Sequence, residues 1–190
     1  ARLSGYADNI LCLEPNKNFF DRIETTSSIA KQLTTLQDYK IQSQFDAILM
    51  IHVIEAIPRY QRMLSFQKLR KLVTDQGRVF VAHNSPYSGY NFIFHDAFRH
   101  DSLIQNRIRK LRSYLRHSGF IYFEHELEIE ARFSSFDQFL AFAIFYTQLR
   151  ENQIRGRLNF ARGFYQNLPR VNGKKILKGA IRLFEGGVHS

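Results

Sequence analysis

Short apolar runs, bounded by polar or turn-forming residues, recur along the first half of the chain. They cover residues 6–14, 45–53 and 78–83, with a weaker run at residues 29–36. Runs of this length are typical of strands that are buried on both faces of a sheet. The run at 45–53, "FDAILMIHV", is the clearest. We therefore predict four strands in this half of the chain.

Between and after these runs, apolar residues recur at intervals of three and four. This spacing places apolar side chains on one helical face, so it predicts helices within residues 16–29 and over residues 62–73 and 102–117. Turn formers ending in Gly77 stop the second helix, and Gly119 closes the third. Strands that alternate with helices indicate a parallel sheet with crossover helices, an α/β fold.

The second half of the chain changes character. Residues 120–133, "FIYFEHELEIEARF", alternate apolar and charged positions, which predicts half-exposed, antiparallel strands at an edge of the sheet. Residues 136–149 have the pattern of a helix with aromatic residues along one face. Such a face is more typical of core packing than of a cofactor site. Beyond residue 150 the pattern weakens, and no internal repeat or low-complexity tract is found.

Composition is that of an ordinary domain. The chain has 190 residues, of which 44% are hydrophobic, enough for a buried core. Cys12 is the one cysteine, so a disulfide framework is excluded and a reducing compartment is expected. The sequence has no apolar run of the roughly 18–20 residues that a membrane helix requires. We expect a soluble, cytoplasmic protein without a membrane span.

The net charge of +10 is concentrated near the C-terminus. From Arg150 to Arg182, nine Lys and Arg residues accompany one acid, Glu151, which gives +8 for this stretch. We therefore divide the chain into residues 1–149, an α/β domain, and residues 150–190, a basic segment. Such a segment favours an anionic partner such as nucleic acid, although a solvated tail is equally compatible with it.

Three segments, in this order, resemble class I S-adenosylmethionine-dependent methyltransferases. They are "ILCLEP" at 10–15, "FDAILMIHVIEAI" at 45–57 and "LRKLVTDQGRVFVAHN" at 69–84. They are similar to the acid-ended second strand, the fourth strand, and the helix, glycine turn and fifth strand of that family. The resemblance implies a Rossmann-like sheet, mostly parallel with an antiparallel edge strand, and methyl transfer from S-adenosylmethionine.

Glu14 is the first candidate for binding this cofactor. A carboxylate at the end of the second strand can accept hydrogen bonds from both ribose hydroxyls of the adenosyl group. Pro15 and Asn16 follow it and are assigned to the same site. The alternative is that Glu14 caps the adjacent helix, although Asn16 is the better cap.

Asp38 is the second candidate. The resemblance implies that an acid after the third strand binds the adenine amine, with Gln37 and Tyr39 lining the ring. Asp38 could equally be an ordinary turn residue. In open parallel sheets the ligand crevice lies outside the carboxyl ends of the strands, where these residues are expected.

His52 ends the clearest strand and is our candidate catalytic base. With Val53, it is expected near the methionine part of the cofactor or near the substrate. A nucleophile that carries a proton needs a base near neutral pH, and His83 is the next candidate. Alternatively, His52 is a half-buried strand-end residue without a chemical role.

The acceptor is expected to be a small molecule. His83, Tyr87 and Tyr90 are our candidate substrate residues, because they lie at or after the end of the strand at 78–83. "NSPY" at 84–87 is similar to a signature of enzymes that methylate base amines, but it follows the fifth strand rather than the fourth, so an ordinary turn explains it better. Histidines, acids and Cys12 show no spacing typical of a metal site.

One part of the family pattern is absent. A first strand and a glycine-rich turn should precede Glu14, yet only Gly5 is found there. We expect a chain that is truncated upstream and lacks its first strand and most of its first helix. Two apolar strands would then lose their shared neighbour. If the sequence is the whole protein, a non-catalytic relative that binds nucleic acid through Arg150–Arg182 is the alternative function.

Overall fold

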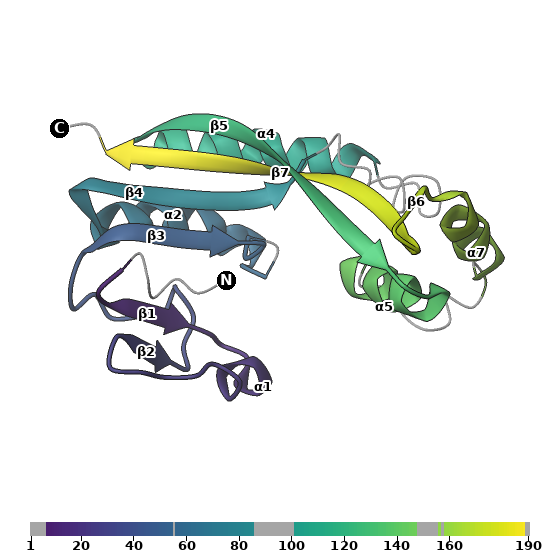
Figure 1. The fold of residues 1–190 in the computed structure, drawn as a ribbon. Helices are drawn as coiled ribbons and strands as arrows, with labels where there is room; N and C mark the ends of the chain where they lie inside the picture. Colours follow the sequence, from purple (N-terminus) through teal and green to yellow (C-terminus); the bar gives the residue numbers. More distant parts are fainter. Residues whose placement is uncertain (1–6, 55, 86–100, 148–155, 157, 189–190) are drawn as a thin grey trace.

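The computed structural model shows a mixed α/β protein with two sheets (Figure 1). Strands β1 to β4 point in one direction, and a long ribbon of β5 and β7 carries a pair of helices beyond their ends. The structure describes residues 7–54, 56–85, 101–147, 156 and 158–188, and among these it describes no side chain of residues 101–106 or 145–147.

The first sheet is small and has two parallel strands. β1 (Ile10–Leu13) pairs with β2 (Ile29–Gln32). Between them lies α1 (Lys17–Phe20), a single helical turn. Asn16 caps this turn, because its side-chain oxygen accepts a hydrogen bond of 2.9 Å from the backbone N–H of Asn18.

The main sheet has five strands within the described residues. Their order is β3–β4–β7–β5, and β6 pairs with β7. β3 and β4 are parallel, whereas β7 is antiparallel to both β4 and β5. The bounds are Phe45–Ile51 for β3, Val73–Asn84 for β4, Phe120–Phe133 for β5, Arg170–Val171 for β6 and Lys174–Val188 for β7.

Two helices cover one face of the main sheet. α2 (Arg62–Leu72) follows the 3-10 helix η2 (Arg59–Gln61) and connects β3 to β4, and α4 (Asp101–His117) precedes β5. The rings of Phe66 in α2 and Tyr114 in α4 stack with centroids 5.6 Å apart, so the two helices are neighbours. Both lie behind the strands in Figure 1.

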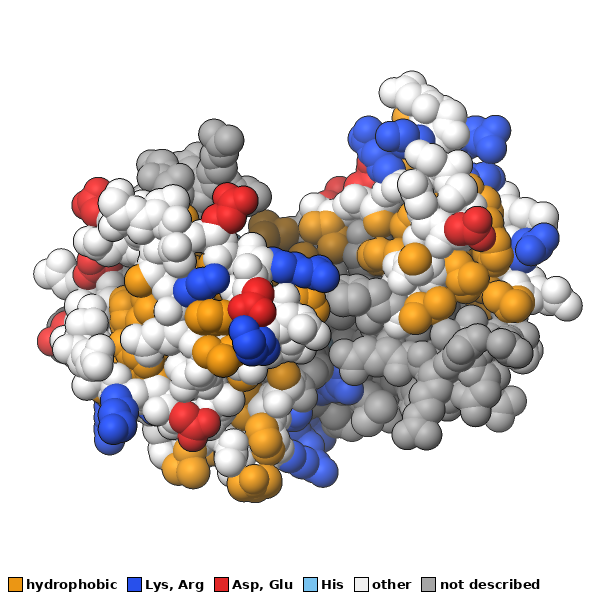
Figure 2. Space-filling view, turned by 90° about the horizontal axis from the view of Figure 1, so that it is seen from below, with side chains coloured by type: hydrophobic (Ala, Val, Ile, Leu, Met, Phe, Trp, Pro, Cys, Tyr) orange, Lys and Arg blue, Asp and Glu red, His pale blue; other side chains and the backbone are white. Residues whose placement is uncertain are grey.

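A second unit is built on the far end of the β5–β7 ribbon. It contains α5 (Phe136–Thr147) and α7 (Leu158–Asn167). Phe133, at the end of β5, packs edge-on against Phe139 of α5, with ring centroids 5.3 Å apart. In the view from below, this unit lies on one side of the molecule and β1 and β2 lie on the other (Figure 2).

The chain therefore has two hydrophobic cores. The main core lies between the sheet and the helices α2 and α4, and the second core lies between the ribbon and the helices α5 and α7. The main core includes Met50, Ile54, Phe66, Leu69, Val79, Val81, Leu111, Leu115 and Phe184. The second core includes Phe133, Phe139, Ala143, Leu168 and Leu177.

The turn predicted at residues 75–77 is an irregularity inside β4. The pairings of Val73 and Arg78 with β3 belong to different registers, so the residues between them bulge out. Gly77 is buried at this bulge, and a Cβ atom there would lie only 2.9 Å from the carbonyl oxygen of Asp46. Close backbone approach, rather than a helix stop, therefore requires this glycine.

Two other elements differ in extent from the prediction. The helix expected within residues 16–29 has only the four residues of α1. Lys31 explains part of this, because its Nζ donates hydrogen bonds to the carbonyl oxygens of Phe20 and Ile23 and holds the chain in a turn there. Residues 120–133 form one continuous strand at the edge of the sheet, antiparallel to β7, rather than two.

β7 was not predicted, and it lies inside the sheet between β4 and β5. Its residues belong to the segment 150–190 that we set apart as basic. Lys175 donates hydrogen bonds to the carbonyl oxygens of Gln166 and Leu168, so part of the charge serves local structure. The division at residue 149 stays a prediction, but β7 joins the two parts through one sheet.

The predicted fold class is confirmed, because the protein is α/β. β1 pairs with β2 and β3 with β4 in parallel, and the main sheet also contains the antiparallel strands β5 and β7. β1 and β3 belong to different sheets, and the expectation that the chain is truncated upstream stays a prediction. None of the helices in the described parts of the chain is both long and apolar enough to cross a membrane.

Candidate functional site

Three of the predicted segments end at the same edge of the molecule. β1, β3 and β4 run in one direction, so the residues that follow them lie at one end of the strands (Figure 1). These residues are Glu14 after β1, His52 after β3, and Ser85 after β4. This edge is where open α/β sheets bind ligands, so we take it as the candidate site.

Glu14 faces its own turn. One carboxylate oxygen, Oε1, accepts a hydrogen bond of 2.8 Å from the backbone N–H of Asn16. Asn16 in turn caps α1, as its position predicts. The capping alternative is thus partly realised, but no hydrogen bond is found on Glu14 Oε2 among the described residues.

Gln37, Asp38 and Tyr39 have different surroundings. Gln37 is tied to α2: its Nε2 donates to Ser65 Oγ at 2.6 Å, and its carbonyl oxygen accepts from Lys68 Nζ at 2.7 Å. Asp38 is exposed and accepts a 2.7 Å hydrogen bond from the Thr35 hydroxyl. Tyr39 is buried.

A groove between β1 and β3 brings these segments together. It has a volume of about 220 Å³, and its lining includes Pro15, Gln37, Tyr39 and Val53. Four of the eight predicted cofactor residues thus share one hollow. Glu14, Asn16, Asp38 and His52 do not line it, although each adjoins a residue that does.

His52 has an unusual backbone. Its φ is +54°, in the left-handed region that few residues other than glycine adopt. Its N–H donates a 3.1 Å hydrogen bond to the carbonyl oxygen of Ala82, which fixes the end of β3 to β4. The His52 side chain is exposed. Strained residues of this kind cluster at functional sites.

His83 and Ser85 are buried at the end of β4. Nδ1 of His83 lies 3.1 Å from the carbonyl oxygen of Asn84. The Ser85 hydroxyl donates a 2.7 Å hydrogen bond to Glu126 Oε2 on β5. Burial of His83 places its ring in the protein interior, so the predicted contact with a substrate would require a rearrangement.

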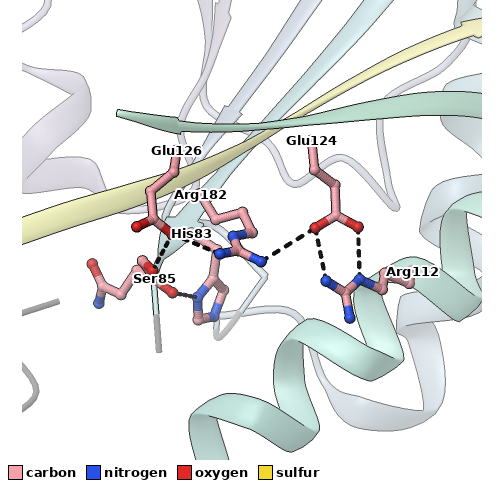
Figure 3. A network of polar contacts seen from close by, with 7 residues as sticks. His83, Ser85, Arg112, Glu124, Glu126 and Arg182 are labelled. Carbon is pink, nitrogen blue, oxygen red and sulfur yellow. Dashed lines mark hydrogen bonds and ion pairs between the residues drawn. The ribbon is translucent and has the colours of Figure 1, made fainter. Parts of the chain in front are cut away.

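A charged network extends from Ser85 across three elements (Figure 3). Arg182 of β7 donates hydrogen bonds to Glu126 at 2.6 Å and to Glu124 at 3.4 Å. Arg112 of α4 binds both carboxylate oxygens of Glu124, at 2.6 and 2.8 Å. The network therefore joins the end of β4 to β5, β7 and α4.

These contacts change the acidity of both glutamates. The hydrogen bond from Arg112 lowers the pKa of Glu124, and the charge of Arg182 adds to the effect. The hydrogen bond from Arg182 lowers the pKa of Glu126, followed by the bond from Ser85. Both carboxylates are consequently held in the charged form near neutral pH.

Sequence reasoning missed this network. The alternating acids of residues 120–133 indicated an exposed strand face, and Arg182 was counted as part of a basic segment. The signal that links them is the pairing of β5 with β7, in which Glu126 lies opposite Arg182. Tyr87 and Tyr90, the other predicted substrate residues, lie outside the described residues.

Comparison by sequence gives no relative: no protein-family model and no curated protein matches the chain. Comparison of structures, in contrast, finds similar proteins. A protein from Bacillus halodurans C-125, provisionally assigned as a methyltransferase, has a TM-score of 0.60 and 8% identity. The match covers 97% of this chain and 84% of that one.

Two further structures are similar. The YcgJ protein of Bacillus subtilis has a TM-score of 0.60 and 10% identity, covering 99% of this chain and 86% of its own. A protein of Anabaena variabilis, provisionally assigned as a methyltransferase of antibiotic biosynthesis, has a TM-score of 0.57 and 10% identity. The match covers 92% of this chain and 80% of that one. The chain therefore has the Rossmann-like fold found in methyltransferases.

Proposed function

We propose that this protein transfers a methyl group from S-adenosylmethionine to a small-molecule nucleophile. The observation that carries the proposal is the meeting of three predicted segments at one edge of a methyltransferase-like sheet: Pro15, Gln37, Tyr39 and Val53 line one groove there. The similar structures support the fold, and two of them are provisionally assigned as methyltransferases. The proposed location is the cytoplasm.

The residues present suit the adenosyl end of the cofactor. Glu14 follows β1 and has one carboxylate oxygen beyond the one that accepts from Asn16, so it could accept from the ribose hydroxyls. Tyr39 offers a buried aromatic ring beside Gln37, and Asp38 offers an exposed carboxylate for the adenine amine. Pro15 and Asn16 would shape the turn beneath the ribose.

Bound S-adenosylmethionine would supply an electrophilic methyl group, so this chain has to orient the acceptor and remove its proton. His52 is the proposed base, since its imidazole is exposed at the end of β3 next to Val53. His83 is buried, so a supporting role suits it better than direct contact with the substrate. Tyr87 and Tyr90 remain the proposed substrate residues.

Calorimetry with S-adenosylhomocysteine tests the ribose contact. Glu14→Gln should weaken binding about 10- to 100-fold, because a hydrogen bond to a charged group contributes roughly 1.5–3 kcal/mol. Glu24→Gln is the matched control, since Glu24 is an exposed acid outside the groove, and its affinity should equal that of the unchanged protein. Equal affinities for both variants would show that Glu14 does not bind the ribose.

Labelled S-adenosylmethionine tests the substrate class. Incubated with the protein and a cell extract, it should label compounds of low molecular mass. Label found in RNA or DNA instead would favour the alternative, a nucleic-acid methyltransferase that uses Arg150–Arg182. The structure supports that alternative less, because Arg182 is paired with two glutamates and Lys175 binds backbone carbonyls.

A further inference from the structure

The β5–β7 ribbon carries a hollow of its own, apart from the groove between β1 and β3. This ribbon hollow has a volume of about 420 Å³, within the roughly 300–1,000 Å³ of small-molecule sites. Gly179 and Ala180 of β7, both buried, line it together with Ile129 and Glu128, the residues opposite them on β5. Because glycine and alanine have the smallest side chains, they leave room over β7.

The ribbon hollow begins where β4 ends. β4 pairs with β7 as far as Asn84 and Ile181, and the N–H of Ser85 then donates a 3.0 Å hydrogen bond to the carbonyl oxygen of Ala180. Beyond this point the ribbon continues without β4 (Figure 1). Glu126, which accepts from the Ser85 hydroxyl, also lines the hollow. A molecule in the hollow would therefore lie beside the carboxyl end of β4, at the edge where open α/β sheets bind ligands.

Two of the acids that line the ribbon hollow already have partners. Glu126 accepts a 2.6 Å hydrogen bond from Arg182 and one of 2.7 Å from the Ser85 hydroxyl. Glu130 is paired with Arg132. The charges of both carboxylates are balanced within the protein, so they are not the groups that select a ligand.

Glu128 and Lys178 also line the ribbon hollow. Lys178 lies opposite Glu130, and Glu128 lies two residues away on the same face of β5, so the Cα atoms of Glu128 and Lys178 are roughly 7–8 Å apart. Both residues are exposed, and within the described residues no hydrogen bond or ion pair is found on either side chain. The hollow therefore presents one carboxylate and one ammonium group that do not pair with each other.

We propose that the ribbon hollow binds a small amino-acid-like zwitterion, with its ammonium group on Glu128 and its carboxylate on Lys178. Such a ligand gives each of these side chains a charge-assisted hydrogen bond. A ligand with a single charge leaves either Glu128 or Lys178 without a contact. Ile129 and Ala180 offer apolar contacts to the rest of the molecule. The two opposite charges therefore select a zwitterion over a simple amine or a simple acid.

The identity of this molecule as the methyl acceptor rests on the proposed function. Its nucleophilic group would then lie toward His52, the proposed base. Since β4 separates β7 from β3, the acceptor has to span about two strand spacings, roughly 10 Å, and so it has a long side chain. The nucleophile forms a bond to the methyl carbon as the carbon–sulfur bond breaks, the electron pair of that bond stays on sulfur, and the proton passes to His52.

Calorimetry with three matched probes tests the ribbon hollow without any cofactor. L-Norleucine carries both charges, pentylamine lacks the carboxylate, and hexanoate lacks the ammonium group. Norleucine should bind about three- to tenfold more tightly than either of the other two, because each of them loses one charge-assisted contact at a solvent-exposed side chain. Norleucine has no nucleophilic group at the end of its side chain, so it reports binding alone.

Substitutions assign each charge to its partner. Glu128→Gln should weaken the binding of norleucine and pentylamine but not of hexanoate. Lys178→Met should weaken the binding of norleucine and hexanoate but not of pentylamine. Asp137→Asn and Lys174→Met are the matched controls, since both residues are exposed and lie outside the hollow, and all three affinities should equal those of the unchanged protein.

Equal affinities for the three probes, or absence of norleucine binding, would overturn the proposal. So would a Glu128→Gln variant that weakens all three probes alike, because the loss would not depend on the ammonium group of the ligand. Selective norleucine binding by a protein that does not bind S-adenosylhomocysteine would support the site and refute the proposed function. Labelled methyl found only in compounds that lack one of the two charges, with norleucine still selected, would overturn the acceptor role alone.

Discussion

His52 combines a strand end, an exposed imidazole and a left-handed backbone. The strand pattern of residues 45–53 predicted an extended His52, but the structure gives it a φ of +54°. The reason is local: the chain must turn sharply after Ile51 to reach η2, while the His52 N–H still bonds to Ala82. The backbone at this residue therefore aims the side chain.

Substitution of His52 separates backbone strain from chemistry. His52→Val should lower the free energy of unfolding by about 1–2 kcal/mol, because a β-branched residue fits the left-handed region poorly. His52→Asn should change it by less than about 0.5 kcal/mol, since Asn tolerates this region. Urea denaturation measures both. Equal losses would show that side-chain contacts, not backbone conformation, determine the stability at this position.

At the scale of elements, the network of Arg112, Glu124, Arg182 and Glu126 holds four of them together at the candidate site. It fixes Ser85 directly after β4. Because Glu124 and Glu126 have lowered pKa values in the folded protein, the network stabilises the fold above the unfolded pKa, near 4.5, and this contribution is lost as pH falls through the folded values.

Arg182→Met should therefore destabilise the protein in a pH-dependent way. At pH 7 the free energy of unfolding should fall by about 1 kcal/mol, a value discounted because both glutamates are partly exposed. The difference from the unchanged protein should shrink as pH falls below about 4.5 and through the lowered pKa values of Glu124 and Glu126, because both carboxylates then become protonated. Urea denaturation across this range measures it. A difference independent of pH would assign the loss to packing.

Lys17→Met is the control for this experiment. It breaks the pair of Lys17 with Asp21, which is largely exposed to solvent. Its effect at pH 7 should stay below about 0.5 kcal/mol, because exposed ion pairs contribute little. A loss as large as that of Arg182→Met would mean that the network is no stronger than a surface pair.

At the scale of the whole molecule, two cores are joined by the β5–β7 ribbon. β4 pairs with β7 only from Arg78 to Asn84, whereas β5 pairs with β7 along its full length, from Phe120 to Phe133. The ribbon therefore extends past the end of β4 and carries α5 and α7 on the side of the candidate site (Figure 1). The two cores should unfold separately.

Phe139→Ala tests this separation. Phe139 is buried and packs against the rings of Phe133, Phe164 and Tyr165, so its removal should cost about 3–5 kcal/mol in the second core. Hydrogen exchange should rise in α5 and α7 while β3 and β4 remain protected. Phe66→Ala, in the main core, should give the reverse pattern. Simultaneous loss of protection everywhere would indicate a single cooperative unit.

The sequence by itself determined the local elements that bury a periodic apolar face. β3, α2 and α4 lie close to the predicted ranges, because their periodicity records which side chains face the core. At the candidate site it identified segments rather than contacts: Gln37 and Tyr39 line a common groove, while Asp38 between them is exposed.

The tertiary structure alone decided what depends on partners far apart in the chain. Residues 174–188 carry lysines, arginine and glycines that indicated a basic tail, yet they form the strand between β4 and β5. Their charges are accommodated because Arg182 lies opposite Glu126 and Lys175 reaches backbone carbonyls. Periodicity reports burial along one segment, whereas pairing across a sheet depends on which segment becomes the neighbour, and that choice is made only when the chain folds.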